Sequence, residues 1–162
     1  MEALIEVMPQ VLQNIADAKL IIIGSGPLYS FLKEKIKTMR LEEEVRLVGQ
    51  VPQEELLSLL RAGDIFLLNT AYEGFSHTLL EAMAMGIPII TTRAGGNQEV
   101  MKDDVNGLLV GYNNKEELKY TMVRLALDGV LRKHLAENAQ KSLEMFTRGK
   151  MVHDTIGVIT SL

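Results

Sequence analysis

Apolar residues recur along the chain in two patterns that alternate from the N-terminus onward. Leu4, Val7 and Val11 lie at helical spacing, and with their apolar neighbours they predict an amphipathic helix over residues 2–16. After it, short apolar runs rich in β-branched residues alternate with further segments of helical period, and a Gly or Pro stands at most of the joints. Such alternation predicts an α/β layer structure.

The apolar runs are continuous rather than alternating, which favours parallel strands that are covered on both faces. We therefore expect a Rossmann-like, doubly wound parallel sheet of about five strands with helices on both faces. The predicted strands are residues 19–23, 45–48, 64–68, 88–92 and 107–110. The predicted helices after the first are residues 28–40, 53–62, 77–85, 97–102, 114–128, 130–146 and 148–161.

Length and composition fit a single globular domain. A chain of 162 residues buries about 70% of its unfolded surface, so one domain is the natural count. The formal net charge of −4 gives no basic footprint for nucleic acid. Aromatic residues make up only 5% of the chain, which argues against stacking platforms for single strands. We expect no nucleic-acid partner.

The features that the sequence lacks narrow its setting. Without cysteine, disulfide scaffolds and thiolate metal sites are excluded, and a reducing cytoplasm is the simplest location. No apolar run approaches the ~20 residues of a membrane span, and no signal-peptide pattern opens the sequence. No cluster of His, Asp and Glu has metal-ligand spacing, so we expect a site without metal or cofactor.

The most informative segment runs from Glu73 to Glu81, where two carboxylates lie eight residues apart. Within residues 79–86 Glu81 is the only charged residue, and burying a lone carboxylate is costly unless it has partners. One interpretation is structural. Thr78 and Glu81 fit a capping box, in which a hydroxyl and a carboxylate satisfy reciprocal backbone donors. On this motif alone the structural interpretation stays open.

A second interpretation is functional. Gly74 permits a turn that would bring Glu73 and the start of the following helix to the same side of the molecule. The free N–H groups and the positive dipole end of a helix start form an anion site. A carboxylate in the first helical turn can accept hydrogen bonds from a vicinal diol. Phosphate and ribose together indicate a nucleotide.

This segment resembles the C-terminal half of the GT-B glycosyltransferases, specifically the large retaining family with a Glu-x7-Glu motif. The resemblance extends over about residues 1–147, and its blocks occur in the family's order. The further blocks are residues 20–27 (LIIIGSGP), 45–49 (VRLVG), 62–68 (AGDIFLL), 95–99 (GGNQE) and 106–110 (NGLLV). Together these blocks make the resemblance much stronger than the Glu-x7-Glu motif alone.

The resemblance implies roles for individual residues. Glu73 would be the catalytic residue beside the transferred sugar, and Glu81 would hold the ribose hydroxyls. The other donor-binding residues that it implies are Gly24, Gly26, Val51, Gly74, Phe75, Ser76, Thr78 and Leu79. His77 occupies a variable family position, and without a carboxylate to orient it this histidine is a weak candidate for a general base.

Two glycine-bearing loops allow alternative explanations. Residues 24–27 lack the third glycine of a dinucleotide fingerprint, because Tyr29 stands in that place. A tight turn with Pro27 at the first helical position and a ligand-lining loop are equally good explanations, and the resemblance favours the loop. Gly95 and Gly96 match a second loop near the donor, but a plain turn explains them equally well.

The resemblance also implies parts that this sequence lacks. In the family, a strand precedes the first helix, lies in the middle of the sheet and is followed by a basic phosphate-binding segment. The strands at residues 19–23 and 64–68 would therefore pair directly, or residues 1–162 are one domain excised from a two-domain enzyme. In the second case the N-terminal, acceptor-binding half is absent as well.

The resemblance implies two cations for the phosphates, since the family usually supplies an Arg and a Lys around the leading strand that this sequence lacks. Arg93, Lys102 and Lys33 are the remaining cations near loop ends, and none of them stands on the matching motif. Because a hydrogen bond to a charged group contributes ~1.5–3 kcal/mol, loss of two such donors weakens binding a hundredfold or more. We expect this chain alone to bind nucleotide sugar weakly.

The activity that the resemblance implies is transfer of a sugar, with retention, from a nucleotide-diphosphate sugar to a sugar, lipid or glycan acceptor. The chain alone would be inactive. A nucleotide-sugar epimerase of similar architecture and a non-catalytic nucleotide-sugar-binding or assembly module are the alternatives. The terminal helix at residues 148–161 would contact the missing half or, if its apolar stripe is exposed, promote self-association. Packing of this helix on its own domain is an equally good interpretation. The parent enzyme would be cytoplasmic, with peripheral association at the inner face of the membrane.

Overall fold

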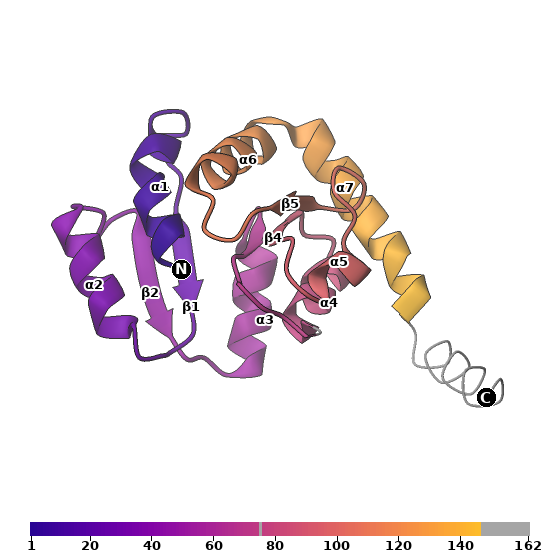
Figure 1. Cartoon of the computed structure of the whole chain (residues 1–162), viewed down its shortest axis with the longest axis horizontal. Helices are drawn as coiled ribbons and strands as arrows, with labels where there is room; N and C mark the ends of the chain where they lie inside the picture. The colour runs from indigo at the N-terminus through magenta and orange to yellow at the C-terminus, as the bar shows by residue number, and fades with distance from the viewer. Residues whose placement is uncertain (75, 147–162) are drawn as a thin grey trace.

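The computed structural model describes residues 1–74 and 76–146 (Figure 1). Phe75 and the predicted helix at residues 148–161 lie outside the described residues. The helices are α1 (Glu2–Leu12), α2 (Tyr29–Thr38), α3 (Gln53–Ala62), α4 (His77–Ala84), α5 (Asn97–Val100), α6 (Lys115–Leu127) and α7 (Gly129–Ser142), followed by the 3-10 turn η1 (Leu143–Phe146). The strands are β1 (Leu20–Ile23), β2 (Val45–Gly49), β3 (Phe66–Leu68), β4 (Ile89–Thr92) and β5 (Leu108–Val110).

The alternation of strands and helices confirms the predicted α/β fold, although most elements are shorter than predicted. The first helix shows why. It ends at Leu12 rather than at residue 16, because the N–H groups of Asn14 and Ile15 both donate to the Val11 carbonyl and turn the chain. The ends of helices and strands depend on such local turns, which cannot be predicted from the spacing of apolar residues.

All the strand pairs are parallel, as predicted, but the strands form two sheets rather than one. β1 pairs with β2 in one sheet, and β4 pairs with both β3 and β5 in the other. Within the described residues β1 and β3 do not pair, so the expectation that these two strands would pair directly is wrong. Figure 1 shows α1, α2, β1 and β2 on one side of the molecule, α4 to α7 with β4 and β5 on the other, and α3 between them.

Helix α1 connects the two sheets because it buries side chains in two separate cores. Ile5 and Met8 pack with residues of β1, β2 and α2, whereas Ala3 and Leu4 pack with residues of β4, β5, α6 and α7. The helix therefore joins the two sheets, although β1 and β3 do not pair. This arrangement explains how two sheets form one compact fold without a shared strand.

A cluster of ionic contacts reinforces α1 at its start. Lys35 of α2 contacts Glu2 at 2.5 Å and also contacts Glu6, which in turn accepts from Lys115 of α6 at 2.8 Å. Hydrogen bonds from Lys115 and Lys35 lower the pKa of Glu6, and those to Glu2 and Glu6 raise the pKa of Lys35. One carboxylate thus links three helices.

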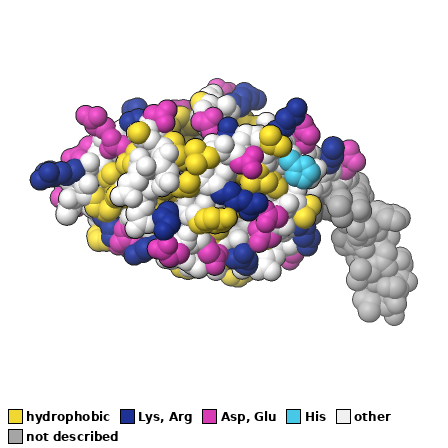
Figure 2. Space-filling view, turned by 90° about the horizontal axis from the view of Figure 1, so that it is seen from above, with side chains coloured by type: hydrophobic (Ala, Val, Ile, Leu, Met, Phe, Trp, Pro, Cys, Tyr) yellow, Lys and Arg dark blue, Asp and Glu magenta, His cyan; other side chains and the backbone are white. Residues whose placement is uncertain are grey.

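On the face that Figure 2 shows, Lys and Arg side chains are interspersed with Asp and Glu side chains. Across residues 1–74 and 76–146, no helix is both long enough and apolar enough to cross a membrane.

Candidate functional site

A cleft of about 1080 Å³ opens between the two sheets. Most of its lining residues are hydrophobic side chains of α1, β1, α3 and β3, and its polar residues include those at the start of α4. Of the predicted donor-site residues, those that line it are Gly24, Val51, Glu73, Ser76 and Thr78. Three segments that are distant in sequence therefore meet at one cleft, next to the carboxyl ends of β1, β2 and β3. Crevices at such strand ends are where open α/β sheets bind ligands.

The remaining predicted residues lie off the cleft or behind it. Gly26, Gly74, Leu79 and Glu81 are not among its lining residues, and Phe75 is outside the described residues. Leu79 is buried in the core between α4 and β4, and its backbone N–H donates to the Ser76 hydroxyl at 3.3 Å. In this structure that N–H therefore serves helix capping.

The start of α4 contradicts the predicted capping box. Ser76 is the N-cap, with extended backbone and its hydroxyl bound to the Leu79 N–H, and His77 is the first helical residue. Thr78 thus lies inside the helix rather than at its cap. Glu81 is the fifth helical residue, just beyond the first turn, and so is not at the position from which a capping-box carboxylate reaches back. The capping-box explanation of Glu81, and the placement of Glu81 in the first turn, are both wrong.

Glu81 is instead held by a residue that sequence reasoning missed. Its Oε1 accepts a hydrogen bond from Nε2 of Gln53, the first residue of α3, at 2.5 Å. Gln53 follows Pro52 and lies two positions after Val51, one of the predicted donor-binding residues. The half-buried carboxylate therefore has a fixed partner on the neighbouring helix. The only signal in the sequence for this contact was a polar residue at the start of the predicted helix, two positions after Val51.

The Glu73 segment is bound through its backbone to the loop after β4. The Glu73 carbonyl accepts from the Gly96 N–H at 2.8 Å. A Cβ added to Gly95 or Gly96 would overlap the carbonyl oxygens of Glu73 and Gly74, far inside the 3.0 Å that real Cβ atoms keep. Gly95 and Gly96 therefore form more than a plain turn, since they allow two loops to touch.

The loop after β1 has a different character. Gly24 adopts a φ of +124°, which other residues rarely adopt, and its N–H donates to the Gly49 carbonyl at 2.7 Å. No atom lies within 4 Å of a Cβ added at Gly24 or Gly26, so this loop faces open space. Helix α2 begins at Tyr29 with Leu28 as N-cap, so the expectation of Pro27 at the first helical position is wrong.

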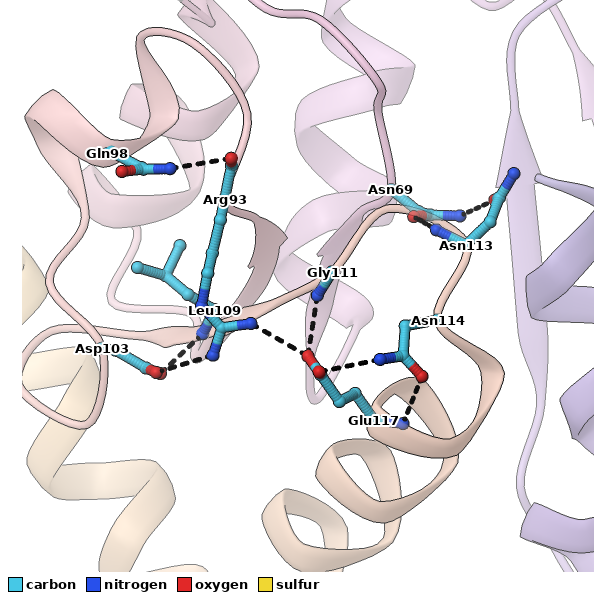
Figure 3. Close-up of polar contacts among 9 residues, drawn as sticks. All are labelled: Asn69, Arg93, Gln98, Asp103, Leu109, Gly111, Asn113, Asn114 and Glu117. Atoms are coloured by element: carbon cyan, nitrogen blue, oxygen red, sulfur yellow. Dashed lines mark hydrogen bonds and ion pairs between the residues drawn. The ribbon is translucent and has the colours of Figure 1, made fainter.

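Arg93, one of the three predicted candidate cations, is engaged elsewhere (Figure 3). Its guanidinium contacts Glu117 at 2.9 Å and Asp103 at 3.1 Å. Glu117 also accepts the Gly111 N–H at 2.7 Å, and this bond, followed by that of Arg93, lowers the pKa of Glu117. The hydrogen bond to Glu117 raises the pKa of Arg93. The side chain links the end of β4 to α6 and is not directed at the cleft.

The other two candidate cations also lie away from the cleft. Neither Lys33 nor Lys102 lines the cleft. The basic residues that do are Lys19, whose ammonium donates to the Glu43 carbonyl at 3.0 Å, and Arg132, which donates to carbonyls of α6. Lys19 precedes β1 and so belongs to the opposite end of the strand from Gly24. In the described part of the chain, no group of three or more His, Cys, Asp or Glu is placed to hold a metal ion.

Asn69 is a second residue that sequence reasoning passed over. This buried side chain follows β3 and donates to the Asn113 side chain at 2.8 Å, while its own oxygen accepts the Asn113 N–H at 3.2 Å (Figure 3). Asn113 has a φ of +55° in the turn before α6. The pair fixes the start of the segment that leads to Glu73. No pattern in the sequence links two asparagines that are this far apart.

Comparison with known proteins identifies one family. The family model described as Glycosyl transferases group 1 matches residues 1–142. An uncharacterised glycosyltransferase of Methanocaldococcus jannaschii is 30% identical over 158 residues, which cover 97% of this chain and 40% of that protein. The N-acetyl-alpha-D-glucosaminyl L-malate synthase of Bacillus anthracis is 34% identical over 137 residues, which cover 84% of this chain and 35% of that enzyme. The chain thus spans less than half the length of these curated relatives.

Solved structures confirm the fold. The C-terminal domain of the group 1 glycosyl transferase LpcC from Francisella tularensis superposes with a TM-score of 0.77 at 28% identity, over 89% of this chain and 77% of that one. HepE from Anabaena, in complex with UDP, superposes with a TM-score of 0.82 at 24% identity, over 99% of this chain and 44% of HepE. The match to a C-terminal domain confirms the predicted place of the chain in the C-terminal half of such an enzyme.

Proposed function

The chain belongs to the glycosyl transferases group 1 family, and on that premise we propose that it forms the donor-binding part of a sugar-transferring enzyme. The donor would be a nucleotide-diphosphate sugar and the acceptor a sugar, a lipid or a glycan. The observation that carries the proposal is the convergence of three separate segments, bearing Gly24, Val51 and Glu73, on one cleft at strand ends. HepE binds UDP, so UDP-sugars are the first donors to test.

The proposed mechanism depends on position and charge. The start of α4 would hold the leaving diphosphate through its N–H groups and the positive end of its dipole. Glu73 would orient the sugar and stabilise the positive charge that develops on it as the diphosphate departs. The acceptor would attack from the same face, so the configuration is retained. We further propose that no metal ion or cofactor takes part.

Glu81 is not among the residues that line the cleft, but Thr78 three positions before it is, and we propose that Glu81 holds the ribose at the edge of the cleft. Its Oε1 is bound by Gln53, which orients the carboxylate and leaves Oε2 to accept from a hydroxyl. Gly24, Gly26 and Val51 would lie along the donor through their backbone. Backbone N–H and C=O groups are the same whatever side chain a residue carries. The identity of the nucleobase is therefore to be determined by experiment.

We also propose that the apolar part of the cleft accepts a further parallel strand from the rest of the protein. Ile21 of β1 is 48% exposed, and all three residues of β3 are half-buried although β4 beside it is fully buried. Within the described residues each of these strands pairs on one edge only, and unpaired strand edges tend to recruit another strand. The greater length of the relatives supports a strand from outside these residues. Amide exchange of β1 and β3 should slow in the intact protein; unchanged exchange would contradict the strand.

The principal test measures sugar transfer by the intact protein. UDP-, GDP- and ADP-sugars are offered with and without acceptors, and the anomeric configuration of the product is determined by NMR. Glu73→Gln should lower kcat about a hundredfold or more with little change in donor affinity, because charge stabilisation acts in the transition state. Glu116→Gln, on the exposed side of α6, is the control. Near-normal turnover of Glu73→Gln would contradict the proposed role.

Other outcomes separate the alternatives. Conversion of the sugar without an acceptor would indicate an epimerase, and binding without turnover would indicate an assembly module. The chain of residues 1–162 by itself should bind nucleotide sugar weakly, since the Lys and Arg residues that line the cleft within the described structure, Lys19 and Arg132, donate to carbonyl groups. Micromolar binding by calorimetry would refute this expectation.

A further inference from the structure

The loop after β4 touches the Glu73 segment more closely than any side chain would allow. The Gly96 N–H donates to the Glu73 carbonyl at 2.8 Å. An added Cβ at Gly96 would overlap the Gly74 carbonyl oxygen, and one at Gly95 would overlap that of Glu73. Both obstacles are backbone atoms, which cannot move aside as the end of a flexible side chain can. The position of the Glu73 backbone is therefore coupled to these two glycines.

The glycine turn is itself anchored in the centre of the second sheet. Asn97 is fully buried, and its amide donates to the Thr91 hydroxyl at 3.0 Å and to the Thr92 carbonyl at 3.3 Å. Gln98 donates to the Arg93 carbonyl at 2.7 Å. β4 pairs on both edges and is fully buried, so the turn is attached to the most enclosed strand of the molecule.

A second contact ties the same strand to the start of the Glu73 segment. The Thr92 hydroxyl donates to the Thr70 carbonyl at 2.7 Å, and the Thr70 hydroxyl donates to the Tyr72 carbonyl at 2.7 Å. The backbone of the segment is thus bound at Thr70, Tyr72 and Glu73. Glu73 is also among the residues that line the cleft.

We propose that Gly95, Gly96 and Thr92 are positioning residues that fix Glu73 at the depth in the cleft where it acts on the sugar. This inference rests on the proposed function of Glu73. A misplacement of about 1 Å in an active site can cost about a hundredfold in rate. A side chain at Gly96, or loss of the Thr92 hydroxyl, would shift the segment without removing any atom of Glu73.

The test compares the intact protein with its Gly96→Ala variant in transfer kinetics. We expect kcat to fall about a hundredfold with little change in the donor KM, because the proposed diphosphate and ribose contacts lie on α4. The double variant Gly96→Ala/Glu73→Gln should turn over no more slowly than Glu73→Gln alone, since both changes remove the same contribution. Multiplied losses would overturn the proposal. Gly129→Ala, at the start of α7, controls for adding a methyl group elsewhere.

A second pair of variants covers the case in which Gly96→Ala does not fold. Thr92→Val keeps the shape of the side chain but removes the hydroxyl that donates to the Thr70 carbonyl, and Thr92→Ser keeps that hydroxyl. We expect Thr92→Val to lower kcat and Thr92→Ser to restore it. Equal rates for the two variants would overturn the proposal. If Glu73→Gln itself has normal turnover, the proposed function fails; if Glu73→Gln is slow while Thr92→Val is normal, only the positioning role fails.

Discussion

Two pairs of glycines follow strands in this chain, and their surroundings are opposite. Gly24 and Gly26 lie after β1, where a side chain would meet no atom within 4 Å. Gly95 and Gly96 lie after β4, where a side chain would overlap the backbone of the Glu73 segment. The first loop leaves room for something outside the chain, whereas the second is filled by the chain itself.

The contrast separates three uses of glycine that a sequence presents as one. Gly24 adopts a φ of +124°, a backbone conformation that favours glycine. Gly96 allows two loops to approach closely. Within the described structure, neither reason for a glycine applies at Gly26. A ligand that lies close to the backbone at such an open position, next to a cleft, would leave no room for a side chain there. The comparison therefore supports a binding role for the loop after β1 and a supporting role for the loop after β4.

The strongest test of this contrast is the stability of Gly96→Ala. The added methyl group overlaps a backbone oxygen, so the loops must separate, and we expect a loss of about 3 kcal/mol in the free energy of unfolding, at the upper end for overpacking. Urea unfolding monitored by circular dichroism measures it. A loss below about 0.5 kcal/mol, the usual size of a neutral surface change, would show that the loops do not need to touch.

Gly24→Ala should cost less, because only backbone conformation opposes it. Strain of a non-glycine residue at such a φ amounts to about 1–3 kcal/mol, and no contact is lost. We expect about 2 kcal/mol in the same urea titration. A cost equal to that of Gly26→Ala would mean that the φ of Gly24 is not required in solution.

Much of this architecture follows from the sequence, because apolar period and β-branched runs report which residues are buried. The helices and strands of the described residues were all predicted, and so was parallel pairing. The cap of α4 was not: Ser76 and Thr78 both carry hydroxyls, and the sequence around them does not decide which one begins the helix. Gln53 was missed because its partnership with Glu81 is a tertiary contact.

The division into two sheets illustrates the same limit. Strand runs predict that strands exist, whereas pairing depends on which edges the packing brings together. Here α1 buries residues in two cores and joins the sheets, and the cleft between β1 and β3 remains. Five of the predicted site residues nevertheless line one cleft: Gly24, Val51, Glu73, Ser76 and Thr78. They all follow carboxyl ends of strands, which point the same way within each parallel sheet.

Gly26→Ala should separate stability from binding. Its φ is not in the left-handed region and no atom is near, so alanine stabilises the isolated chain by about 0.5 kcal/mol through a less flexible unfolded state. If the loop lies along the donor, the same variant of the intact protein binds the donor several-fold more weakly. Unchanged donor affinity in calorimetry would count against a ligand at this loop. Gly63→Ala, which makes only ordinary contacts at the end of α3, is the matched control.

The last prediction concerns the ionic link next to the glycine turn, where Arg93 joins Glu117 and Asp103 (Figure 3). Both sides of this link are more than a third exposed, so Glu117→Gln should cost only about 0.5–1 kcal/mol at neutral pH. Hydrogen bonds from Gly111 and Arg93 lower the pKa of Glu117 below its ordinary value of 4.5. The contribution of Glu117 to stability is therefore complete above pH 4.5 and is lost as the pH falls through the lower pKa of the folded state.

Unfolding by urea at pH 7 and below pH 4 measures this pH dependence. The loss of stability in acid should be smaller for Glu117→Gln than for the parent chain. Glu116→Gln, whose carboxylate contacts only Lys119 among the described residues, should leave the parent's acid loss unchanged. Identical acid profiles for the parent and Glu117→Gln would show that this link does not hold the end of β4 to α6 in solution.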